Sequence, residues 1–70
     1  SKTVSFYDVV TNASNAAPIV ITAPKHDLTN GETVYIDQVE GNTAANGTWT
    51  VANATTDTFE LAGSSGNGAY

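Results

Sequence analysis

The stretch VEGNTAANGTWTV, residues 39–51, carries the clearest indication of the fold. Its first half gathers Gly and Asn, residue types that adopt left-handed turn conformations at low cost. Its second half alternates, with Trp49 and Val51 on one side and Thr48 and Thr50 on the other. This pattern predicts a tight loop that leads directly into a half-buried β-strand, with Trp49 facing the interior.

Comparable strand-like segments lie on both sides of this stretch. They cover residues 3–10, 18–23, 32–39 and 58–62. Turn-forming residues separate them, including the dipeptides Asn30-Gly31 and Asn46-Gly47, which are typical of tight turns. No part of the chain shows sustained helical spacing of apolar residues. The sequence therefore predicts an all-β fold, a small antiparallel β-barrel or sandwich of five to six short strands.

The same alternation divides the chain and assigns its interior. The predicted core consists of Val20, Leu28, Val34, Ile36, Trp49, Val51, Phe59 and Leu61. We expect an N-terminal strand or arm at residues 1–16, a β-barrel module at 17–62 and a Gly/Ser-rich tail at 63–70. The composition of the tail is typical of a flexible segment. Its terminal Tyr70 is expected to dock, either on the barrel or on a neighbouring molecule.

Composition argues against several classes of function. Seventy residues make one small domain, and without Cys and with a single His the chain cannot build a thiolate or multi-His metal site. The formal net charge is −5, with Lys2 and Lys25 as the only cations, which disfavours nucleic acid and anionic lipid as partners. No apolar run is long enough to span a membrane. We expect no metal, no cofactor, no nucleic-acid partner and no membrane partner.

Few residues suggest chemistry. His26 is expected to be a turn residue whose ring bonds nearby backbone, because no nucleophile or water-orienting group can be named beside it. Asp27, Asn30 and Glu32 faintly resemble a calcium loop but lack its alternating oxygen ligands. The remaining carboxylates are dispersed, as on a solvated surface. These observations predict that the protein is not an enzyme.

Two segments, APIVITAPKHDLTNGETVYIDQVEGNTAANGTWTV (17–51) and TTDTFELAGSSGNGAY (55–70), carry a family resemblance. Together they resemble a small β-barrel module that recurs in phage virion proteins, in tail, fibre and baseplate chains. That module is grouped with the first catalytic-cysteine half-domain of ubiquitin-activating enzymes. The block around Trp49 is the most specific part, whereas Asp27 stands where the module usually has Gly. The resemblance implies a β-barrel without an active site.

The resemblance leads to an expected function. We expect a non-enzymatic structural or interaction module of a phage virion or similar extracellular assembly, such as a decoration, tail or fibre component. Its partners would be copies of itself or other virion proteins. The alternative is a carbohydrate-binding module of a host-recognition fibre, with a glycan stacked on Trp49 or on exposed tyrosines. The candidate interface residues are Phe6, Tyr7, Val9, Tyr35 and Tyr70.

The N-terminal segment raises a separate question. Residues 1–10 lie outside the resemblance, yet they alternate like a good strand. An unpaired apolar strand is an aggregation hazard, so this segment needs a partner edge. We expect it to add to the sheet of a neighbouring subunit. The competing prediction is that it pairs with residues 58–62 of its own chain.

Overall fold

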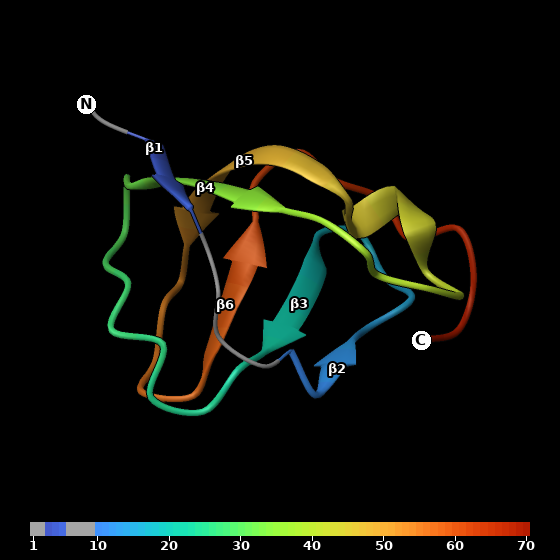
Figure 1. The fold of residues 1–70 in the computed structure, drawn as a ribbon, viewed down its shortest axis with the longest axis horizontal. Helices are drawn as coiled ribbons and strands as arrows, with labels where there is room; N and C mark the ends of the chain where they lie inside the picture. The colour runs from blue at the N-terminus through green and yellow to red at the C-terminus, as the bar shows by residue number, and fades with distance from the viewer. Residues whose placement is uncertain (1–2, 6–9) are drawn as a thin grey trace.

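Six short strands form a single curled sheet (Figure 1). The computed structural model describes the backbone of residues 3–5 and the whole of residues 10–70. The elements are β1 (Thr3–Ser5), β2 (Asn12–Ala13), β3 (Ile19–Thr22), β4 (Thr33–Ile36), the 3-10 helix η1 (Thr43–Ala45), β5 (Gly47–Ala52) and β6 (Thr58–Leu61). Their order in the sheet is β1-β4-β5-β6-β3-β2. Strands β2 to β6 pair antiparallel and curl into a half-barrel, which confirms the predicted all-β class.

The longest strand, β5, makes the corner of the barrel. Its first four residues pair with β4, and this register places Val34 opposite Trp49. Its last two residues pair with β6, which places Val51 opposite Leu61. A strand that changes partner along its length lets a sheet fold over on itself. The strand predicted to follow the Gly/Asn-rich loop is therefore also the element that closes the curl.

The core lies between the inner faces of the curled sheet. Phe59, Leu61, Val34 and Val51 are almost completely buried, as is Ile36. In β4 and β6 the buried residues alternate with more exposed ones, as period-two patterning requires. Leu28, in the loop between β3 and β4, is buried as well. These six residues all belong to the predicted core.

Val20 differs from the prediction. It is only half-buried, whereas its neighbours Ile19 and Ile21 are fully buried. The run Ile19-Val20-Ile21 is apolar throughout, so the sequence alone does not fix which residues face inward. Pairing with β6 decides the matter, because Ile21 lies opposite Phe59 and Val20 lies opposite Glu60. The inward face of β3 is therefore formed by the two isoleucines.

Trp49 is less buried than the sequence predicts. It packs against the core cluster but stays half-buried. Its indole Nε1–H donates a hydrogen bond of 2.8 Å to the backbone carbonyl of Ala45. A Trp side chain needs a partner for its N–H when it leaves water, and the loop before β5 supplies one. Trp49 thus fastens the loop to the barrel as well as filling part of its interior.

The N-terminal strand pairs inside its own chain, with a different strand from the one named in the competing prediction. β1 lies parallel to β4, with Thr3 beside Thr33 and Ser5 beside Tyr35. The predicted intrachain partner, residues 58–62, is therefore wrong, because β6 lies between β5 and β3. Phe6, Tyr7 and Val9 lie outside the described residues.

Candidate functional site

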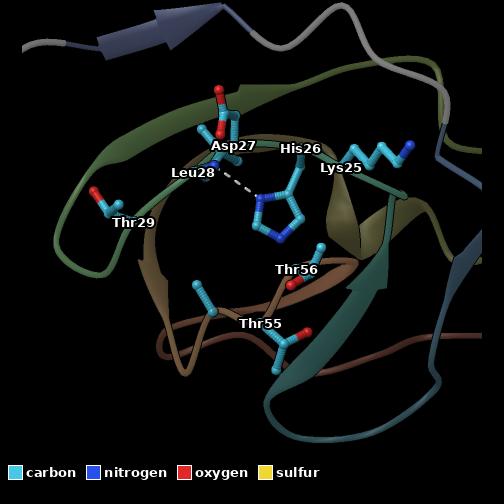
Figure 2. Close-up of a pocket in the computed structure, with 8 residues that line it drawn as sticks. Lys25, His26, Asp27, Leu28, Thr29, Thr55 and Thr56 are labelled. Carbon is cyan, nitrogen blue, oxygen red and sulfur yellow. Dashed lines mark hydrogen bonds between the residues drawn. The ribbon is translucent and has the colours of Figure 1, made fainter.

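A shallow hollow lies between two turns at one end of the barrel (Figure 2). Its volume is about 810 Å³. It is lined by Lys25, His26, Asp27, Leu28, Thr29, Ala54, Thr55 and Thr56. This hollow contains the one histidine of the chain, so it is the candidate site for acid–base chemistry.

The His26 ring uses both of its nitrogens in the fold. The backbone N–H of Leu28 donates to Nδ1 at 2.9 Å, the bond drawn in Figure 2. Because Nδ1 accepts, the proton of the neutral ring sits on Nε2, which donates to the carbonyl of Thr58 at 2.9 Å. His26 is 6% exposed, and its ring meets Phe59 edge-on, with the ring centroids 5.0 Å apart. His26 therefore braces the turn against β6, which matches the expectation that its ring bonds backbone.

The turn that carries His26 has an unusual backbone. Lys25 and Asp27 both have positive φ, at 55° and 63°, a region that non-Gly residues rarely adopt. Asp57 steadies this turn, because its carboxylate accepts from the N–H of Lys25 at 3.1 Å and its carbonyl accepts from the N–H of Ala23 at 2.8 Å. The left-handed conformation at Asp27 is one that Gly adopts at lower cost.

Two residues of the segment that faintly resembles a calcium loop, Asn30 and Glu32, use their side-chain oxygens to accept backbone hydrogen bonds. One Glu32 carboxylate oxygen accepts from the backbone N–H of Thr29 at 2.6 Å and from its hydroxyl at 3.0 Å. The Asn30 side-chain oxygen accepts from the N–H of Ala54 at 2.8 Å. Within residues 3–5 and 10–70, no group of three or more His, Asp or Glu side chains gathers in the manner of a metal site.

The Gly/Asn-rich loop at 39–47 centres on Asn42, whose side chain is fully buried. Its Nδ2 donates to the carbonyls of Ala13 at 3.1 Å and Ser14 at 2.9 Å. Its Oδ1 accepts from the backbone N–H of Asn67 at 3.1 Å. One side chain thus ties the β2 strand, the loop and the C-terminal tail together. No local sequence pattern distinguishes this Asn from the neighbouring asparagines.

Two further asparagines complete this junction. Asn46 pairs with Val39 as a strand residue would, accepting from its N–H at 2.9 Å and donating to its carbonyl at 3.0 Å. Asn67 accepts from the N–H of Ala44 at 3.0 Å and donates to the hydroxyl of Thr43 at 3.1 Å. We name Asn42, Asn46 and Asn67 the asparagine junction. It holds the loop in the shape that delivers Trp49 to the barrel.

The C-terminal tail is bonded to the barrel along its length. The Ser64 hydroxyl accepts from the N–H of Ile19 at 2.9 Å and donates to the carbonyl of Leu61 at 2.5 Å. The N–H of Gly66 donates to Ala16 at 2.9 Å. The hydroxyl of Tyr70 donates to the carbonyl of Val10 at 2.7 Å. The terminal aromatic therefore docks on its own chain, although 52% of its surface stays exposed.

The other predicted interface residue that the structure describes is Tyr35. It lies on the outer face of β4, opposite Thr48 on β5, and is 45% exposed. Thr33 and Thr50 form the next pair on the same face. We name these four residues, Thr33, Tyr35, Thr48 and Thr50, the threonine–tyrosine face. Tyr35 and Tyr70 belong to different parts of the fold, one on this face and one at the end of the tail.

No family model matches this chain, and neither a curated protein nor a solved structure does. Among the described residues, the structure contains no helix with the length and apolar character needed to cross a bilayer.

Proposed function

We propose that this protein is a non-enzymatic structural and interaction module of a phage virion or a similar extracellular assembly. In that setting it would act as a decoration, tail or fibre component. It would work by presenting a rigid, acidic barrel to copies of itself or to other virion proteins. The resemblance of residues 17–70 to a virion β-barrel module supports this setting.

The observation that carries the proposal is the role of the buried polar side chains. His26, Asn42 and Ser64 are the buried polar residues of the described chain, and each one bonds backbone of a distant segment. Every buried side-chain nitrogen and oxygen in that part of the chain has a hydrogen-bond partner. These groups act as braces, and a braced surface loses little entropy when it docks.

The threonine–tyrosine face is the contact surface that best fits this role. A tyrosine supplies large contact area with few rotatable bonds, and tyrosines are frequent anchors in interfaces. Tyr35 rises from a β-sheet whose flanking hydroxyls can form hydrogen bonds at the rim of a contact. The net charge of −5 favours partners with a basic or neutral surface.

Sedimentation velocity over a range of concentrations tests the proposal. The parent chain should self-associate, or should bind to intact virion material added to it. Tyr35→Ala should weaken that association and leave the melting temperature unchanged. Thr56→Ala, which changes an exposed threonine of the hollow, is the matched control. A chain that stays monomeric at every concentration and binds no virion component would contradict the proposal.

Carbohydrate binding is the second candidate, and the exposure of Tyr35 is the observation that favours it. The ring stands beside the hydroxyls of Thr48 and Thr50, so a sugar could stack on it and form hydrogen bonds. Trp49 is a poorer platform, because its N–H is bonded to Ala45 and its ring packs on the core. A glycan array separates the two candidates: binding that Tyr35→Ala abolishes would favour the carbohydrate module.

A further inference from the structure

The outer edge of β4 needs an occupant. Val34 and Ile36 are core residues, with 0% and 2% of their surface exposed, so this strand cannot leave the barrel without opening the core. Its one neighbour within the antiparallel part of the sheet is β5. On the other side its backbone N–H and C=O groups would form an open edge, which proteins normally cover. β1 covers that edge through the parallel pairs Thr3–Thr33, Val4–Val34 and Ser5–Tyr35.

β1 is an addition at the edge of the antiparallel sheet. β1 and β2 follow one another in the sequence but occupy opposite ends of the sheet order. Residues 6–11, six residues in all, join them. The strands β2 to β6 already form a continuous antiparallel sheet, so β1 is an addition to its free edge and not a link within it.

We propose that the outer edge of β4 is a strand-acceptor site whose occupant in the assembled state is residues 3–5 of a second copy of this chain. The arriving strand would keep the register seen here. Exchange would preserve every β1–β4 hydrogen bond, because the same residues pair in either arrangement. The choice between the two then depends on the short connection and on protein concentration. This inference rests on the proposed function, since it names how copies would join.

Disulfide trapping between two differently mutated copies tests the exchange. The chain has no Cys, so introduced thiols can pair only with each other. Neighbouring strands lie about 4.8 Å apart, within the range of Cα separations that a disulfide spans. Thr3→Cys protein would be mixed with Thr33→Cys protein, incubated at high concentration and then oxidised. The product would be examined by non-reducing electrophoresis and mass spectrometry.

The expected product is a covalent heterodimer of twice the 7.2 kDa chain mass, several-fold more abundant than in the control. The control mixes Thr3→Cys with Thr56→Cys, whose thiol would lie on the exposed turn between β5 and β6. If the mixture of Thr3→Cys and Thr33→Cys protein gives no more heterodimer than the control, the proposal is overturned. Self-association of the parent without such heterodimers would reject strand exchange and leave the assembly function standing.

Discussion

The side-chain oxygen of Asn42 accepts a hydrogen bond from the backbone N–H of Asn67 at 3.1 Å, across 25 residues of sequence. This bond joins the loop before β5 to a tail whose composition suggests flexibility. The opposite end of the same amide donates to two carbonyls beside β2. One buried side-chain amide therefore links the end of β2, the loop before β5 and the C-terminal tail.

Asn42→Ala should be one of the most destabilising substitutions in the loop. It would leave the carbonyls of Ala13 and Ser14 and the N–H of Asn67 without their partner. Only the bond to Ala13 is fully buried, and a buried group left unpaired costs about 1–3 kcal/mol, so we expect a loss of about 2–3 kcal/mol in the free energy of unfolding. Urea denaturation followed by circular dichroism measures it. Asn12→Ala, an exposed asparagine in β2, is the control and should change stability little.

Gly41→Ala should release the tail from the loop. A Cβ on Gly41 would overlap the carbonyl oxygen of Ala69, and its φ of +78° is already unfavourable for Ala. Gly63 has nearly the same φ, +79°, but a Cβ there meets nothing within 4 Å. Gly63→Ala therefore reports the backbone strain alone, about 1–2 kcal/mol. The loss of stability at Gly41 should be larger, and the difference between the two losses measures the steric overlap with the tail.

Limited digestion with carboxypeptidase adds a direct measure of this contact. Gly41→Ala should expose Ala69 and Tyr70 to rapid cleavage. In the Gly63→Ala variant the same residues should be removed more slowly. Equal losses of stability and equal cleavage rates in the two variants would mean that the tail does not depend on its approach to Gly41.

The extent to which sequence predicts this fold varies from strand to strand. Strands β4, β5 and β6 were predictable because polar and apolar residues alternate clearly in them. The phase of β3 was not, because its first three residues are all apolar and only its register with β6 selects the inward pair. Parallel pairing of β1 with β4 joins segments about thirty residues apart, and no local pattern encodes such a partner.

The asparagine junction shows a similar limit. The Gly/Asn-rich composition predicts a turn at this position, but not which asparagine becomes buried. Asn42 and Asn46 look equivalent in sequence, and they differ because the tail reaches Asn42 while Val39 reaches Asn46. The bonds of Ser64 to Ile19 and of Asn67 to Ala44 also span long stretches of chain. Polar side chains in such loops carry no local signal of their distant partner.

His26→Ala should lower the stability of the fold, because the ring braces the turn at the end of the barrel. The Leu28 N–H and the Thr58 carbonyl would both lose their partner, and Phe59 would lose its ring contact. We expect a loss of about 2–4 kcal/mol from two unpaired backbone groups and reduced packing. Thr55→Ala, at the rim of the hollow, serves as a milder comparison because its hydroxyl bonds lie near the surface.

Nuclear magnetic resonance can check the ring directly. Long-range nitrogen–proton correlation spectra of the parent should show the neutral tautomer with its proton on Nε2, since Nδ1 accepts from Leu28. A spectrum of the other neutral tautomer at neutral pH would show that the ring does not brace the turn in this way.

The last prediction concerns the two adjacent β-branched residues of β3. Ile21 is fully buried opposite Phe59, whereas Val20 is half-buried opposite Glu60 on the outer face. Ile21→Thr removes apolar volume from the core and places a hydroxyl among apolar side chains, so we expect a loss of about 2–4 kcal/mol. Val20→Thr makes a similar chemical change on the outer face, where β-branched threonine suits a strand, and should change stability by about 0.5 kcal/mol or less. Thermal and urea unfolding of both variants measure the difference. A larger loss for Val20→Thr than for Ile21→Thr would mean that β3 does not hold the register with β6 described here, because a shift of one residue exchanges the inward and outward faces.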